Sequence, residues 1–168
     1  MVSVRPASLE EAAAIGGHRR AMFSDMGYGE QTALDTMTTA FIPWVQAKMI
    51  AGEYLAWFAV SEDGEVAAGV GLWLMDWPPH MIGSGKRRGN ILNVYTRPEF
   101  RRQGLARKLT ETAVEWCRSH GIKTVILHAS DQGRDLYRSL GFEPTNEMRR
   151  LLYPCGALRA RSAACRRN

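Results

Sequence analysis

The spacing of apolar positions along this chain of 168 residues changes several times, and each pattern predicts one kind of element. Apolar residues that recur every three or four positions indicate helices, whereas short apolar and β-branched runs bounded by turn residues indicate strands. The predicted helices cover about residues 8–26, 33–51, 104–120 and 130–141, and the predicted strands cover about residues 2–5, 54–60, 66–75, 90–96, 124–129 and 147–153.

Several local signals set the limits of these elements. Ser8 and Glu11 form the pattern of a capping box at the start of the first helix. Pro43 predicts a break or kink within the second helix, and residues 62–65 predict a hairpin turn between two strands. The order strand, helix, strand, helix from residue 90 onward predicts a βαβα unit with a parallel pair of strands at its centre.

The start of the third predicted helix carries an unusual charge pattern. Residues 101–108 contain four basic residues and no acidic one. A helix N-terminus ordinarily favours acidic side chains, because its free N–H groups and the macrodipole are positive there. A basic solvated surface is one interpretation, but the single glycine, Gly104, and the flanking arginines favour a phosphate-binding turn.

Two motifs connect this turn to a known family. No G-x-x-x-x-G-K-[ST] or G-x-G-x-x-G string is present, whereas residues 101–106 read R-x-x-G-x-A. That string, together with the Leu-Tyr…Leu-Gly-Phe pattern that ends the stretch 127–142, resembles the acyl-CoA signature of the GNAT superfamily of N-acetyltransferases. The resemblance implies an α+β fold, an α/β/α sandwich whose mixed sheet of about six or seven strands is covered by about four helices. It also implies that the fourth and fifth strands splay apart.

The resemblance further implies a site for acetyl-CoA as co-substrate, without a metal. The splayed strands would pair with the pantetheine arm, and the N–H groups of the basic turn would hold the pyrophosphate. Tyr137 would be the general acid that protonates the departing thiolate, and the N–H of Val94 would contact the oxyanion. The residues expected to bind the co-substrate are Val94, Tyr95, Thr96, Arg101, Arg102, Gln103, Gly104, Leu105, Ala106, Arg107, Ser130, Gly133, Arg134 and Tyr137.

No base for the attacking amine is evident. Many members of the family place a carboxylate on the fourth strand, where this chain has Asn90 and Asn93. His128 and Asp76 are candidates, and so is His80, but transfer through water would require no protein base.

The acceptor is expected to be an amine, most simply of a small molecule. The residues expected near it are Asp25, Tyr28, Trp73, Asp76, Trp77 and His80. Their aromatic content favours an acceptor with an apolar portion, with Asp25 or Asp76 attracting its ammonium group. A protein N-terminus or lysine acceptor, and a sensor module that binds acyl-CoA without turnover, stay open as alternatives.

Composition and charge bear on the domain organisation, the partners and the location of the protein. Four arginines of residues 155–168 account for most of the net charge of +5, because the rest of the chain has 18 basic and 17 acidic residues. We therefore expect one GNAT domain over residues 1–154 and a basic tail over 155–168, with nucleic acid an improbable partner. The three cysteines do not indicate a disulfide framework. The absence of a leader-like or membrane-length apolar run favours a cytoplasmic protein, and a homodimer is compatible with the resemblance.

Overall fold

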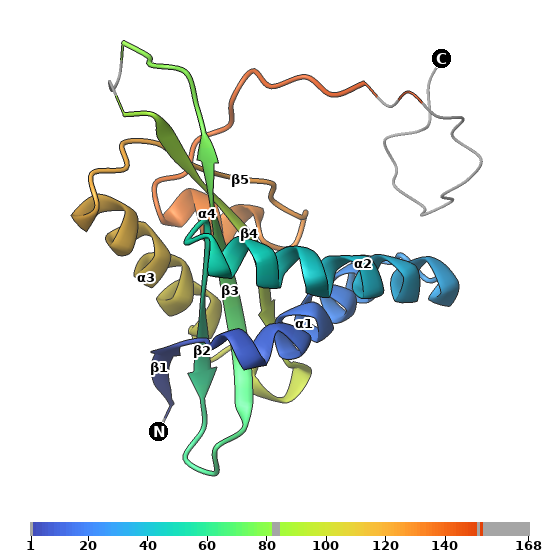
Figure 1. Ribbon diagram of the computed structural model, residues 1–168. Helices are drawn as coiled ribbons and strands as arrows, with labels where there is room; N and C mark the ends of the chain where they lie inside the picture. The colour runs from blue at the N-terminus through green and yellow to red at the C-terminus, as the bar shows by residue number, and fades with distance from the viewer. Residues whose placement is uncertain (1, 82–84, 151, 153–168) are drawn as a thin grey trace.

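The computed structural model describes residues 2–81, 85–150 and 152, and within them one mixed sheet is covered by helices on both faces (Figure 1). The sheet has the order β1-β2-β3-β4-β5. Its strands are β1 (Ser3–Pro6), β2 (Tyr54–Val60), β3 (Val66–Asp76), β4 (Arg87–Thr96) and β5 (Val125–Leu127). The first four strands pair antiparallel, and β5 pairs parallel to β4.

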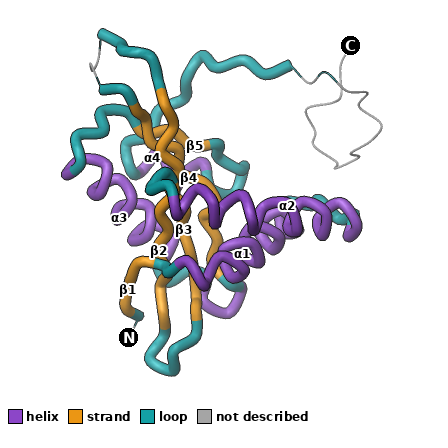
Figure 2. The backbone as a smooth tube through the Cα atoms, viewed as in Figure 1, coloured by secondary structure: helices purple, strands orange, loops and turns teal. Residues whose placement is uncertain are grey.

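The helices lie in two layers on opposite sides of this sheet (Figure 2). Their bounds are α1 (Ala12–Asp25), α2 (Gln31–Ile50), α3 (Leu105–Ser119) and α4 (Arg134–Ser139), with short 3₁₀ turns η1 (Leu9–Glu11) and η2 (Pro98–Phe100). Helices α1 and α2 cover one face, and α3 packs on the other. The predicted α/β/α sandwich is therefore confirmed.

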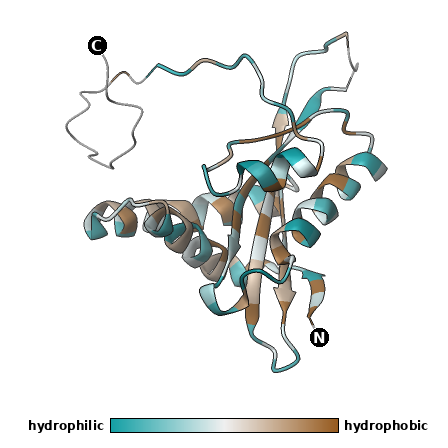
Figure 3. Cartoon of the chain, turned by 180° about the vertical axis from the view of Figure 1, so that it is seen from behind, coloured by the Kyte–Doolittle hydropathy of each residue, from teal (hydrophilic) through white to brown (hydrophobic). Residues whose placement is uncertain are grey.

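Alternation along β2 explains why the protein has two cores. Ala56 and Phe58 are buried in the core under α1 and α2, whereas Trp57 and Ala59 are buried in the core under α3. Successive side chains of a strand point to opposite faces, so a strand covered on both faces is apolar at nearly every position. Figure 3 shows the hydrophobic residues concentrated along the sheet and on the helix faces turned toward it.

Two features inside the helices, Pro43 and Gly16, have a packing explanation. Helix α2 runs unbroken through Pro43, because Phe41 and Val45, on either side of the proline, are buried in the core and hold both halves of the helix in place. Gly16 marks the place where α1 meets α2, since a Cβ there would lie 2.8 Å from Ile42 Cγ1. Small size at the helix crossing accounts for this glycine inside a helix.

The C-terminal predictions need correction. The sheet of the described residues has five strands rather than six or seven, because residues 147–150 are exposed and form no strand. Helix α4 begins at Arg134 with Gly133 as its N-cap, later than the start at about residue 130 predicted for this helix. The remaining residues of the predicted last strand, 151 and 153, and the predicted tail over 155–168 lie outside the described residues.

Candidate functional site

The predicted splay between β4 and β5 is present. The two strands pair only from Gly89–Ile91 to Val125–Leu127, while β4 continues to Thr96. Beyond Ile91 the edge of β4 that faces away from β3 therefore has no partner strand among the described residues. Unpaired N–H and C=O groups at a strand edge can bond to an extended ligand that contains amides, as an added strand would.

A β-bulge shapes the same part of β4. Gly69 lies opposite Tyr95 and Gly71 opposite Leu92, so Asn93 and Val94 share one position of β3. Asn93 has a φ of +57°, in the left-handed region, and its side chain is buried. Bulges of this kind bend a strand and redirect a side chain, and they often occur beside functional sites.

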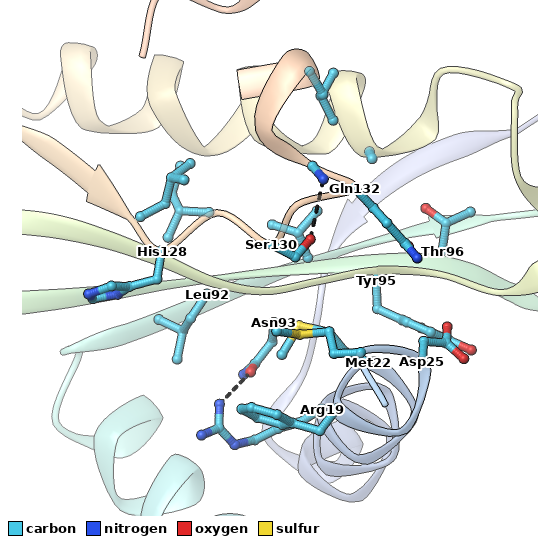
Figure 4. Close-up of a pocket in the computed structure, with 18 of the residues that line it drawn as sticks. Arg19, Met22, Asp25, Leu92, Asn93, Tyr95, Thr96, His128, Ser130 and Gln132 are labelled. Atoms are coloured by element: carbon cyan, nitrogen blue, oxygen red, sulfur yellow. Dashed lines mark hydrogen bonds between the residues drawn. The ribbon is translucent and has the colours of Figure 1, made fainter. Parts of the chain in front are cut away.

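A cavity of about 1310 Å³ extends from the splay in both directions. One end lies against the turn before α3, and the other lies between α1, α2 and β4. Figure 4 shows Arg19, Met22 and Asp25 projecting from α1 toward β4, with Ser130 and Gln132 on the other side of that strand. A single continuous space thus joins the basic turn to an aromatic compartment.

The turn before α3 presents free N–H groups to this cavity. From Arg102 to Arg107 the backbone N–H groups donate to no backbone acceptor in the described part of the chain, and Lys108 is the first to do so, at 3.0 Å from the oxygen of Gly104. Arg102 and Gly104 have φ values of +63° and +75°. Successive N–H groups in such a turn form an anion-binding concavity at the positive end of the helix.

The arginines of this turn have different partners. The guanidinium of Arg101 is ion-paired with Asp25 and also donates to the carbonyl of Thr96 at 3.0 Å. Arg107 donates to Ser139 at 2.6 Å and lies near Glu111. Arg102 takes part in none of the ion pairs of the described residues, so its guanidinium is the best placed of the three to meet a phosphate.

Tyr137 reaches the cavity from α4. Its ring packs edge-on against Phe142, with 6.0 Å between ring centroids, and burial raises the pKa of its phenol. Gly133 makes room for this ring, because a Cβ there would lie 2.8 Å from Cε2 of Tyr137. A protonated phenol held in a fixed position is suited to donate a proton.

The three candidate bases occupy different places, and His80 does not line the cavity. His128 lines the cavity, although its side chain is largely exposed, and its Nε2 lies 3.4 Å from a carboxylate oxygen of Glu147. Asp76 lies at the end of β3, is 94% exposed and pairs with Arg87 at 3.6 Å. Asp76 does not line this cavity, so the structure brings His128 but not Asp76 to the splay.

The aromatic compartment contains residues that the sequence interpretation missed. Arg19 donates from Nη1 to Asn93 at 2.8 Å, and Asn93 in turn donates to the hydroxyl of Tyr54 at 2.9 Å. The guanidinium also lies over the rings of Phe23 and Phe41, at 4.9 and 4.8 Å from their centroids. Arg19 and Phe23 are four residues apart on one helix, a spacing that indicates a shared face, but only the fold brings Asn93 to them.

Most of the predicted site residues meet at this cavity. Of the predicted set, those that line it are Asp25, Tyr28, Trp73, Val94, Tyr95, Thr96, Arg101, Arg102, Gly104, Leu105, Ala106, Arg107, His128, Ser130, Gly133 and Tyr137. Those that do not line it are Asp76, Trp77, His80, Gln103 and Arg134. Three of the latter lie at or beyond the end of β3, where the chain extends past the sheet (Figure 2).

The described residues lack two further features, a metal-binding cluster and a membrane-spanning helix. They contain no cluster of three or more His, Cys, Asp or Glu side chains arranged to hold a metal ion. They also contain no helix that combines the length and apolar character needed to cross a membrane.

Comparison with known proteins places this fold and site in a class. Residues 20–142 match the model of the acetyltransferase (GNAT) family. The chain belongs to this family of acetyl-CoA-dependent N-acetyltransferases, which confirms the resemblance carried by its two motifs.

Individual relatives agree with this assignment. A GCN5-related N-acetyltransferase from Ralstonia eutropha JMP134 is 32% identical, with a TM-score of 0.84 over 90% of this chain and 99% of that one. A Clostridium acetobutylicum protein described as a predicted acetyltransferase, crystallised with acetyl-CoA, is 26% identical, with a TM-score of 0.78 over 90% and 96% of the two chains. A Bacillus subtilis (strain 168) protein, provisionally named a ribosomal protein bS18-alanine N-acetyltransferase, is 24% identical over 61% of this chain and 66% of its own length.

Proposed function

We propose that the protein transfers the acetyl group of acetyl-CoA to the amine of a small-molecule acceptor. The observation that carries this proposal is the single cavity that joins a basic turn with free N–H groups, an unpaired edge of β4 and an aromatic compartment. The co-substrate would place its pyrophosphate on the N–H groups of residues 102–107 and its pantetheine arm along Val94–Thr96.

The chemistry that follows is direct attack of the amine on the thioester carbonyl. The carbon–nitrogen bond forms, the carbon–sulfur bond breaks, and the phenol of Tyr137 gives its proton to the departing thiolate. The N–H of Val94 is our candidate donor to the oxyanion. The amine loses its proton to water or to His128, an imidazole that lines the cavity.

The aromatic lining of the compartment supports a small acceptor. Met22, Trp44 and Trp73 line this end, and the two tryptophan rings meet edge-on with 5.3 Å between centroids. Such a surface favours the apolar body of a compact molecule. The alternative acceptor is a protein N-terminus, which the name of the Bacillus relative suggests, and the test below therefore includes peptides.

The test is a screen for thiol release from acetyl-CoA with a panel of small amines and short peptides. We expect saturable release with at least one small amine and slower release with every peptide. Preference for peptides would reject the small-molecule acceptor. Saturable binding of acetyl-CoA with no transfer to any amine would instead favour the sensor alternative.

A further inference from the structure

The charges of the acceptor compartment differ from those expected for a site that attracts an ammonium group. Asp25 is the one carboxylate among the described residues that line the cavity. It is ion-paired with Arg101 and lies near Tyr95, on the side toward the basic turn. No unpaired carboxylate is therefore left in the described lining to receive a positively charged acceptor.

Arg19 carries the opposite charge in the same compartment. Its guanidinium has one hydrogen-bond partner among the described residues, the neutral side chain of Asn93, and it takes part in none of their ion pairs. The Nε atom is buried without a hydrogen-bond partner. Burial lowers the pKa of Arg19, as expected where desolvation of a cation is not offset by a neighbouring anion.

The position of the guanidinium is fixed by its neighbours. The rings of Phe23 and Phe41 hold it by cation–π contact, and Asn93 is itself fixed by Tyr54 and by the bulge of β4. Asn93 accepts a hydrogen bond from one N–H of Nη1. The other N–H groups of the guanidinium have no hydrogen-bond partner among the described residues. A planar carboxylate is the anion that best matches such a planar set of donors.

We propose that Arg19 determines acceptor specificity by binding a carboxylate, and that the acceptor is an amine whose apolar body carries such a group. This inference rests on the proposed function, because it names the class of acceptor that occupies the same cavity. An amino acid with a large apolar or aromatic side chain has all three features: an amine to acetylate, a carboxylate for Arg19 and an apolar body for the wall of Trp44 and Trp73.

The test compares acceptors that differ only in the carboxylate. Thiol release from saturating acetyl-CoA is measured for L-phenylalanine against 2-phenylethylamine and L-phenylalaninamide, and for L-methionine against 3-(methylthio)propylamine. We expect kcat/KM to favour the acid of each series by about tenfold or more, in line with a charge-assisted hydrogen bond. Equal or better transfer to the amines that lack the carboxylate would overturn the inference and leave the acetyltransferase proposal standing.

Variants of Arg19 test whether this residue causes the preference for the acid. Arg19→Gln should abolish the preference for the acid mainly through KM, whereas Arg19→Lys should retain part of it. Arg20→Gln is the matched control, because Arg20 is adjacent in sequence but bonds to Asp35 and Gln31 and does not line the cavity. A preference that survives Arg19→Gln would also overturn the inference.

The remaining outcomes separate the two proposals. A phosphonate analogue of phenylalanine that is preferred over the amino acid would overturn the assignment of a carboxylate. If no acid or amine is acetylated, the inference fails, and binding of desulfo-CoA then shows whether the donor site survives. Failure of that binding as well would reject the proposed function itself. The comparison of acceptors uses the unmodified protein, so it decides the question even if the Arg19 variants do not fold.

Discussion

Gly104 illustrates how one residue serves both backbone geometry and ligand approach. Its φ of +75° lies where glycine is favoured, and a Cβ built there would meet no protein atom within 4 Å. The glycine is therefore not needed to avoid a clash within the protein. Its two contributions are the left-handed turn, which aims the free N–H groups, and an open surface in front of them.

Replacement of this glycine by an acid should selectively weaken binding of the co-substrate. Gly104→Glu introduces strain and places a carboxylate in the proposed phosphate site, so we expect the Kd for CoA, measured by calorimetry, to rise more than tenfold. Gly52→Glu is the matched control, because Gly52 has a similar φ of +66°, has an equally open Cβ position and lies away from the cavity. Equal effects of the two substitutions would mean that the turn before α3 does not hold the phosphates.

Substitution of Tyr137 should lower the rate of acetyl transfer without weakening the binding of CoA. Tyr137→Phe keeps the ring and its packing against Phe142 but removes the proton donor, so kcat should fall by about tenfold or more while the Kd for CoA stays within about twofold. Because burial raises the phenol pKa above its usual value near 10, Tyr137 should remain protonated up to and beyond that pH. Stopped-flow and steady-state rates should therefore not decline between pH 6 and 9.5 through loss of the Tyr137 proton. The pH profiles of the wild type and of Tyr137→Phe should accordingly have the same shape on the alkaline side. Loss of CoA binding in Tyr137→Phe would make this tyrosine structural.

At the scale of elements, the capping box ties β1 to the start of the first helical segment. The backbone N–H of Ser8 donates to a carboxylate oxygen of Glu11 at 2.8 Å, and Arg5 of β1 donates to both oxygens of that carboxylate. These bonds, led by the one from Arg5, lower the pKa of Glu11 to about 2. A depressed carboxylate pKa stabilises the folded state above the unfolded pKa, and this contribution is lost as the pH falls toward the folded value.

Glu11→Gln should therefore reduce stability in a pH-dependent way. We expect urea denaturation to show a loss of about 1–2 kcal/mol at pH 7, discounted because both partners are partly exposed, and a smaller loss as the pH falls from 4.5 toward 2. Glu115→Gln, which removes a largely exposed partner of Arg118 within α3, should change the free energy of unfolding by less than about 0.5 kcal/mol. A difference between wild type and Glu11→Gln that does not vary with pH would contradict this account.

At the scale of the whole molecule, local patterns predicted the elements better than they predicted the site. The strand over residues 54–60 and the basic turn before α3 follow from patterns contained within a few residues. Of the break or kink predicted at Pro43, the break is absent, because burial of Phe41 and Val45 outweighs the missing hydrogen bond. The strand predicted over residues 147–153 is absent from 147–150, where three of the four residues are charged and the fourth, Met148, is 95% exposed.

The parts of the site that escaped prediction depend on contacts between distant segments. Asp25 is engaged by Arg101, 76 positions away, and Arg19 is held by Asn93, 74 positions away. The sign of the charge available to an acceptor is the outcome of these pairings. Because Asp25 is paired with Arg101, we assign the recognition of the acceptor to Arg19 instead of to attraction of an ammonium group by Asp25.

We propose that one cavity holds CoA by the turn before α3 and the open edge of β4. Calorimetric titration of the protein with desulfo-CoA, with ATP as the control, is the decisive measurement of this binding. We expect saturable binding of desulfo-CoA in the micromolar range, with ATP much weaker because it lacks the pantetheine arm. Absence of binding, or equal affinity for the two ligands, would refute the proposed CoA site.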